Sequence, residues 1–460
     1  MGAKTRYHRD PREVALNLLY RVEHKGAYAN LAVDRELDRY EDNGSQHALV
    51  TELVNGTVRM RKHLDWVLNL FLSKPIQNQN PWLREILRMS VYQLLFMDNV
   101  PEYAVVNEAV GLAGRKLDRG LSAVVNGVLR NVIRNRGEIP YPDMYQNPVE
   151  YLSVYYSHPE WMVARWVERY GLEGACQLLE HNNVRPRVAL RTNLLKVDRE
   201  ELFRSLTDEG CRCALSRLTP WGVWVEETGK PLRKLHSYRE GWFYVQDDAS
   251  MLVSAACAPE AGQVVYDLAA GVGGKTSHLA ELMGNQGIIR AVEILPKKVE
   301  ILKENIRRLG VTIVDIWTGD ALGPLAPGWG EGDVVLLDAP CSGLGVLRRR
   351  SDARWRKSEK DITVLSELQK RLLKRGAQLV RPGGVLVYST CTLEPEENEE
   401  VIDWFLEVET GFVLDDLSQP LRFFPFSPED AKAASRGMLV LSPPRYGTDG
   451  MFIARLRRTR

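Results

Sequence analysis

The sequence lacks the features that mark secreted, membrane-spanning or strongly basic proteins. Its 460 residues include only six cysteines, with no C-x-x-C pair, so we expect neither disulfides nor a structural zinc site and predict a reducing, cytoplasmic location. No apolar run reaches the roughly 18 residues that a membrane-spanning helix needs. With 61 basic and 60 acidic residues the formal net charge is +1, so overall charge does not indicate nucleic-acid binding.

What the chain does contain is the composition of an ordinary globular protein, long enough for two or three domains. Residues 150–245 mix helical and strand-like segments and predict a small α+β subdomain. In residues 246–460, short apolar runs such as "VVYDLAAG" and "DVVLLDAP" alternate with amphipathic helical stretches. This alternation predicts an α/β fold class, with a Rossmann-like, doubly wound and mostly parallel sheet.

Residues 1–140 predict an all-α bundle, because their apolar residues recur at helical spacing. One segment, "LSAVVNGVLRNVIRNRG", puts Val125 and Leu129 on one helix face and Asn126, Arg130 and Arg134 on another. A second basic cluster, "RRRSDARWRK", begins at residue 348. Basic clusters of this kind are equally compatible with a solvated surface and with a phosphate contact.

A glycine-rich loop, "DLAAGVGGKTSH", follows the first apolar run of the predicted sheet and precedes a helix. It is not a phosphate-binding P-loop, because Ala269 stands where that motif needs its first glycine. It is not the dinucleotide fingerprint either, because Thr276 replaces the third glycine. The loop therefore suits a ligand that approaches the backbone closely without a chain of phosphates.

Two acidic residues refine this interpretation. Glu293 ends the second predicted strand, where a carboxylate can accept hydrogen bonds from ribose hydroxyls. Asp320, in "TGDA", ends the third, where it could accept from an adenine amino group, and we expect both to be buried acceptors. A glycine loop and two acids in this order indicate a nucleoside cofactor, and S-adenosylmethionine is the candidate.

Two cysteines follow apolar runs in "DAPCSGLG", residues 338–345, and "YSTCTLEPEEN", residues 388–398. Since ligands bind beyond the carboxyl ends of parallel strands, Cys341 and Cys391 are expected at the ligand-binding edge and not in the core. A thiolate that adds to C6 of cytosine makes C5 nucleophilic enough to take a methyl group. Asp338 could hold the base by accepting from its exocyclic amine. The residues alone leave open which cysteine attacks.

The glycine-rich loop and the two cysteine motifs closely resemble those of the Nol–Nop–Sun group of RNA cytosine-5 methyltransferases. The segments "VQDDAS" and "DGMFIARL" resemble that group as well. "NEAVGLAG" and "SAVVNGVLRN" resemble the NusB-like RNA-binding bundle. The combination is similar to group members that act on small-subunit ribosomal RNA. The resemblance implies that the chain divides into three domains, residues 1–140, 150–245 and 246–460. It also implies that the enzyme methylates 16S ribosomal RNA at C5 of one cytosine, of the cytosine 967 class. The implied substrate is naked RNA or an early assembly particle, and the enzyme is expected to be a monomer that needs neither metal nor membrane.

The resemblance implies that Cys391 is the nucleophile, whereas DNA cytosine-5 enzymes use the position of Cys341. Cys341 is implied to aid product release, and Asp338 to complete the catalytic set. The implied S-adenosylmethionine-binding residues are Ala269, Ala270, Gly271, Val272, Gly273, Gly274, Lys275, Glu293, Asp320 and Asp338. The group more often has Cys, Ala and Pro where this chain has Ala269, Gly271 and Val272, and aspartate where it has Glu293.

Two other functions compete with this hypothesis. The same chemistry could act on transfer RNA or large-subunit RNA. Alternatively, the chain could be a non-catalytic RNA-binding assembly factor with a methyltransferase fold, although both cysteines argue against that. If the protein binds RNA, the basic cluster that begins at Arg348 is expected to contact phosphate.

Overall fold

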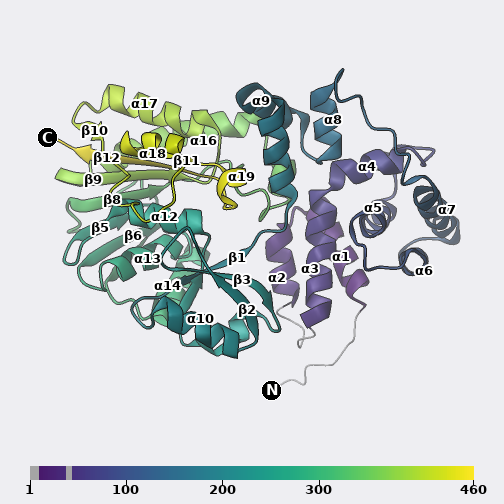
Figure 1. The fold of residues 1–460 in the computed structure, drawn as a ribbon, viewed down its shortest axis with the longest axis horizontal. Coiled ribbons are helices and arrows are strands. Elements are labelled where there is room, and N and C mark those ends of the chain that lie inside the picture. Colours follow the sequence, from purple (N-terminus) through teal and green to yellow (C-terminus); the bar gives the residue numbers. More distant parts are fainter. Residues whose placement is uncertain (1–9, 38–43) are drawn as a thin grey trace. The chain divides into compact units, whose positions relative to one another are not determined.

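The computed structural model describes residues 10–37 and 44–460 (Figure 1). The chain divides into two compact units. The first contains the residues up to Arg185 together with Leu347–Arg356, and the second contains Pro186–Val346 and Lys357–Arg460. Within the described ranges, no helix combines the length and apolarity required to cross a membrane.

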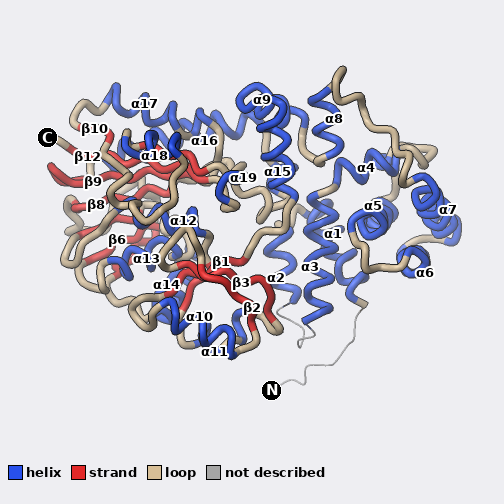
Figure 2. The backbone as a smooth tube through the Cα atoms, in the orientation of Figure 1, coloured by secondary structure: helices blue, strands red, loops and turns tan. Residues whose placement is uncertain are grey.

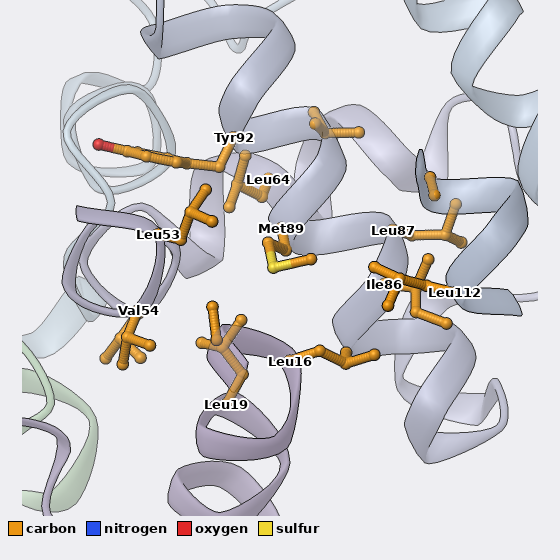
Figure 3. Packing of buried hydrophobic residues seen from close by; sticks show 14 of the residues in the cluster. Leu16, Leu19, Leu53, Val54, Leu64, Ile86, Leu87, Met89, Tyr92 and Leu112 are labelled. Carbon is orange, nitrogen blue, oxygen red and sulfur yellow. The ribbon is translucent and has the colours of Figure 1, made fainter. Parts of the chain in front are cut away.

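The described residues of the first unit form helices joined by loops, without a strand (Figure 2). Asp10 accepts a hydrogen bond from the backbone of Arg12 at the start of the first helix, and Gly26 ends that helix at φ 68°. Leucines from four helices, Leu16, Leu53, Leu87 and Leu112 among them, are fully buried together (Figure 3). The helices are α1 (Pro11–Lys25), α2 (Ala29–Leu37), α3 (Gly44–Arg59), α4 (Arg61–Asn69), α5 (Pro81–Phe96), α6 (Glu102–Lys116), α7 (Arg119–Asn135), α8 (Pro148–Tyr155), α9 (Glu160–Asn183) and α15 (Ala353–Arg356).

The short segment Leu347–Arg356 is an internal part of this helical unit. Arg354 is fully buried and donates hydrogen bonds to the carbonyls of Ser157 and Asn182 and to the side chain of Asn183, at 2.9–3.1 Å. Arg348 is only 5 % exposed. The expectation that this basic cluster contacts RNA phosphate is therefore wrong for both arginines. Arg354 instead satisfies carbonyls at the ends of α8 and α9.

The second unit begins with a small antiparallel sheet in the order β2-β3-β1-β4. Leu190, Val223 and Phe243 from three of its strands are fully buried in one apolar cluster with α10. This sheet confirms the predicted α+β subdomain, although β2 and α10 were not predicted. Its elements are β1 (Val188–Thr192), α10 (Arg199–Asp208), β2 (Cys211–Leu215), β3 (Gly222–Thr228), α11 (His236–Arg239) and β4 (Phe243–Val245).

A larger sheet of eight described strands follows, in the order β10-β12-β9-β8-β5-β6-β7, with β11 added beside β12. The pairs among β5 to β9 are parallel, whereas β10, β11 and β12 form antiparallel pairs at one side. The strands are β5 (Val264–Asp267), β6 (Ile288–Glu293), β7 (Val314–Thr318), β8 (Gly332–Asp338), β9 (Val380–Thr390), β10 (Phe412–Leu414), β11 (Met438–Leu441) and β12 (Met451–Arg458).

Helices cover both faces of this sheet, because successive residues of its central strands are apolar on both sides (Figure 1). Val334 and Leu336 of β8 pack with α12, α13 and α14, whereas Val335 and Leu337 pack with α16 and α17. The predicted α/β fold class is confirmed. The remaining helices are α12 (Asp248–Cys257), α13 (Gly274–Leu282), α14 (Pro296–Leu309), α16 (Glu359–Ala377), α17 (Glu399–Val408), α18 (Pro428–Ser435) and α19 (Pro443–Tyr446).

The buried position of Arg354 predicts a structural role. Arg354→Gln should lower the free energy of unfolding by about 3 kcal/mol, because it leaves buried carbonyls without a charged donor. Exposed Arg350 supplies the matched control, since Arg350→Gln removes the same charge from the same segment. Denaturant titration followed by circular dichroism measures both variants, and equal stability in the two would contradict the assignment.

Candidate functional site

Two loops at the carboxyl ends of neighbouring parallel strands bring the motif cysteines into contact. β8 and β9 pair with Asp338 opposite Ser389, and each strand ends at or one residue beyond this pair. The Sγ atoms of Cys341 and Cys391 lie 3.3 Å apart. Cys341 Sγ also accepts a 3.3 Å hydrogen bond from the backbone N–H of Cys391. The two motifs, fifty residues apart in sequence, therefore form one site.

The environment of Cys341 favours its neutral thiol. The pKa of Cys341 is raised well above its ordinary value, first by the hydrogen bond with Cys391 and then by burial and the nearby charges of Cys391 and Glu397. Cys341 is thus favoured as the protonated partner, which can donate an S–H hydrogen bond to a Cys391 thiolate. The pair is suited to chemistry in which one sulfur is an anion and the other an acid.

Gly345 allows the two cysteine loops to approach at backbone distance. Its N–H donates to the carbonyl of Cys391 at 3.0 Å, and its carbonyl accepts from the N–H of Gly450 at 2.8 Å. A Cβ at this position would lie 2.6 Å from the Gly450 oxygen and 2.9 Å from the Cys391 oxygen. Any larger residue would therefore push the loop of Cys341 away from that of Cys391.

The segment after Cys391 braces both loops. Glu397 accepts hydrogen bonds from the backbone N–H of Ser342 at 2.8 Å, from the Ser342 hydroxyl and from Gln369 at 3.0 Å. Asn398 accepts from the hydroxyl of Thr390, which precedes Cys391. Burial raises the pKa of Glu397, although these donors oppose the rise. The "PEEN" part of the second motif therefore positions the first.

A lysine and an aspartate form an ion pair beside the cysteines. Lys275 Nζ donates to Asp338 Oδ2 at 2.6 Å, and the Ser389 hydroxyl donates to Asp338 Oδ1 at 2.8 Å. Burial acts to lower the pKa of Lys275, but the charge and hydrogen bond of Asp338 and the charge of Cys391 raise it. Lys275 is thus a cation whose charge acts on Cys391, and a nearby cation favours a thiolate.

The glycine loop turns sharply between β5 and α13. Gly271 and Gly273 have φ values of 59° and 88°, in the left-handed region that favours glycine. Glu293 accepts from the N–H of Gly271 at 2.9 Å, and Asn305 donates to the carbonyl of Val272 at 2.8 Å. A Cβ on Gly271 would meet only the Ala269 oxygen, at 3.9 Å. The backbone at Gly271 is therefore open on the side where a Cβ would project.

The two acids predicted to hold the cofactor have different surroundings. Glu293 is 5 % exposed, and its second oxygen accepts from the N–H of Leu295 at 2.9 Å, so each oxygen retains acceptor capacity. Asp320 is exposed and accepts from the backbone of Leu322 at 2.9 Å. The expectation of a buried acceptor at Asp320 is wrong, because β7 ends at Thr318 and Asp320 lies in the loop beyond it.

Comparison with known proteins identifies the family. Family models match residues 9–134 (NusB family), residues 158–230 (RsmF/B-like methyltransferase, ferredoxin-like domain) and residues 254–457 (16S rRNA methyltransferase RsmB/F). A probable ribosomal RNA small subunit methyltransferase B of Bacillus subtilis is 37% identical over 97% of this chain and 98% of its own. A Synechocystis relative of the same name is 36% identical over 97% and 99%. This chain belongs to the ribosomal RNA small subunit methyltransferase B family.

Solved structures agree with membership in the methyltransferase B family. The crystal structure of PH0851 is 29% identical, with a TM-score of 0.81 over 99% of this chain and 100% of its own. A methyltransferase homolog protein from Pyrococcus horikoshii is 31% identical, with a TM-score of 0.57 over 67% and 97%. The family predicted from the cysteine and glycine-loop motifs is therefore confirmed, as is the NusB-like nature of the N-terminal bundle.

One further residue of this methyltransferase B chain was not found from sequence. Arg191 on β1 is fully buried and donates to the Gly274 carbonyl at 2.7 Å, to Ser277 at 2.8 Å and to both oxygens of Glu281 at 2.8–2.9 Å. Burial raises the pKa of Glu281 to about 6 despite this partner. Arg191 fixes the first turns of α13, which carry Lys275. Its only sequence signal is a charged residue within an otherwise apolar strand.

The contacts of Glu397 predict that it positions Cys341 without touching the cofactor loop. Glu397→Gln replaces an acceptor that faces the Ser342 N–H with an amide that also carries donors. The rate of methyl transfer should fall about ten- to a hundredfold, since small displacements of a reacting group have effects of that size. Cofactor affinity should not change. Glu400→Gln, at an exposed site on α17, is the control. A selective loss of cofactor affinity would contradict this role.

Proposed function

We propose that this protein transfers a methyl group from S-adenosylmethionine to C5 of a cytosine in 16S ribosomal RNA, of the cytosine 967 class, through a covalent cysteine adduct. The observation that carries the proposal is the contact of Cys341 and Cys391 beside the Lys275–Asp338 ion pair. The names of the relatives, small-subunit methyltransferases of ribosomal RNA, support the substrate.

In the proposed mechanism Cys391 is the nucleophile. Its thiolate, favoured by the charge of Lys275, adds to C6 of the cytosine, and the electron pair of the C5–C6 double bond becomes available at C5. Asp338 accepts a hydrogen bond from the exocyclic amine and orients the base. The cofactor, held by Ala269–Lys275 with Glu293 and Asp320, supplies an electrophilic methyl group.

Product release completes the proposed reaction. The C5 proton is lost to a base, the C5–C6 double bond re-forms and the bond from Cys391 to C6 breaks. Cys341 assists this step because its proton is available to the departing thiolate across 3.3 Å. The target base must leave any stack to reach the two sulfurs.

The three parts of the chain have distinct proposed roles. Residues 246–460 carry the chemistry, and residues 150–245 fix the cofactor helix through Arg191. Residues 1–140 supply affinity for RNA. The protein acts as a monomer in the cytoplasm and needs no metal. Action on transfer RNA or large-subunit RNA is less well supported, because the NusB match accompanies relatives named for the small subunit. A non-catalytic assembly factor would not need two cysteines in contact.

The cofactor assignment predicts a graded loss of affinity. Glu293→Ala removes a nearly buried acceptor and should weaken S-adenosylmethionine binding by about 1.5–3 kcal/mol, roughly ten- to a hundredfold. Asp320→Ala should weaken it less, because water screens an exposed carboxylate. Glu304→Ala, exposed on α14, is the matched control. Isothermal titration calorimetry gives the three constants, and wild-type affinity in Glu293→Ala would refute the assignment.

The roles of the two cysteines predict opposite defects. Cys391→Ala should abolish methyl transfer, because no thiolate remains to activate C5. Cys341→Ala should form the adduct and accept the methyl group but release product slowly, so a covalent protein–RNA complex should accumulate. Denaturing gel electrophoresis with labelled RNA detects the complex.

The double variant and Cys176→Ala serve as controls for this experiment. The double variant should form no complex, and Cys176→Ala should behave as wild type, because Cys176 lies on α9 in the helical unit. Accumulation of the complex in Cys391→Ala would reverse the two roles. Its absence from both single variants would argue against covalent catalysis.

A further inference from the structure

The helices α6 and α7 form an antiparallel pair with an unusual distribution of charge on α7. The seventeen residues of α7 include three arginines and no acidic residue. Its buried face consists of Val125, Val128, Leu129 and Val132. Residues 119, 130 and 134 lie on the opposite face, because steps of eleven and four residues complete almost whole turns.

This opposite face, formed by Arg119, Arg130 and Arg134 and called here the α7 face, is exposed along its length. The residues between the arginines are small: Ala123 and Gly127 are exposed, and a Cβ on Gly127 would meet nothing within 4 Å. At 1.5 Å per residue the arginines span about 22 Å, which is enough to follow several phosphates of a nucleic-acid strand.

The arginines of the α7 face differ from three other arginines of the same unit. Arg130 donates to the side chain of Asn126 at 3.0 Å, and among the described residues none of the three pairs with a carboxylate. The one acid close in sequence, Asp118, caps α7 by accepting from Leu121. In contrast, Arg21, Arg115 and Arg136 are 43%, 47% and 55% exposed and each pairs with a carboxylate. Unpaired arginines on one face are available to an external anion.

An open hollow of about 600 Å³ lies between α6 and α7, and Ala123 of α7 is part of its lining. Asn107, Ser122 and Asn126 contribute amide and hydroxyl groups to it, and Gly111 leaves its floor without a side chain. These groups can donate to and accept from ribose hydroxyls.

An exposed aromatic residue lies further along α6. Tyr103 is 72% exposed and lies one helical turn before Asn107, on the same face of α6. The ion pair of Glu102 with Arg136 places this end of α6 beside the end of α7. An exposed tyrosine next to a row of arginines offers a stacking surface for an unpaired base.

We propose that the α7 face and Tyr103 bind a single-stranded or looped segment of the substrate RNA, with phosphates along Arg119, Arg130 and Arg134 and a base stacked on Tyr103. The inference rests on the proposed function and adds to it the surface by which the helical unit holds RNA. Charge complementarity selects RNA, because the row offers three cations without a carboxylate partner among the described residues, beside amide and hydroxyl groups.

The test measures binding of the full-length protein to protein-free 16S ribosomal RNA transcribed in vitro, over a range of salt concentrations. Replacement of Arg119, Arg130 and Arg134 by Gln should weaken binding about tenfold or more. It should also reduce the slope of log K against log salt by about two to three, since each lost phosphate contact contributes roughly 0.7–0.9. Tyr103→Ala should weaken binding about five- to a hundredfold without changing the slope, because no charge is lost.

A matched control replaces Arg21, Arg61 and Arg115 by Gln, which removes three charges from the same unit that already pair with carboxylates. Its slope should remain that of wild type, and thermal unfolding should verify that both triple variants fold. Equal salt slopes in all variants would overturn the proposal and would indicate a protein partner for this face. An equal loss of RNA affinity in both triple variants would also overturn it. Methyl transfer by the wild type is scored separately: if it is absent while the slope effect persists, the proposed function fails and the RNA-binding surface stands.

Discussion

The parallel pairing of β8 with β9 is the interaction on which the site depends. It fixes Asp338 opposite Ser389, so the loops that leave the two strands begin side by side. Every contact between the cysteines follows from that starting point, including the backbone approach at Gly345 and the support from Glu397. A shift of one residue in this register would turn Asp338 toward the other face of the sheet and separate it from Lys275.

Much of this arrangement was predictable, because it depends on local patterns. Short apolar runs between helices indicate a parallel sheet, and residues just after such runs must meet at its carboxyl edge. The positions of Cys341, Cys391 and the glycine loop follow directly. The antiparallel strands β10 and β11 were not predicted, since three- and four-residue strands give too short a pattern to recognise.

The errors concern residues whose role depends on distant parts of the chain. Arg354 lies in a basic cluster that looks solvated, yet its partners are carbonyls about 170 to 200 positions earlier. Arg191 likewise finds Glu281 across 90 positions. Asp320 was assigned as buried because its motif follows a strand, but the strand ends two residues sooner. Burial of a charged side chain is decided by tertiary partners, and local sequence does not contain them.

The helical unit is discontinuous in sequence: Leu347–Arg356 belongs to it, although the residues on both sides belong to the other unit. The chain therefore passes from one unit to the other three times. A gene shortened to encode Pro186–Arg460 would still specify Arg354 and Trp355 but not the carbonyls that accept their hydrogen bonds. Loss of the N-terminal region would thus leave these side chains without their hydrogen-bond acceptors, so the segment after the first cysteine motif would have to change as well. Changes in the sequence of one unit therefore constrain the sequence of the other.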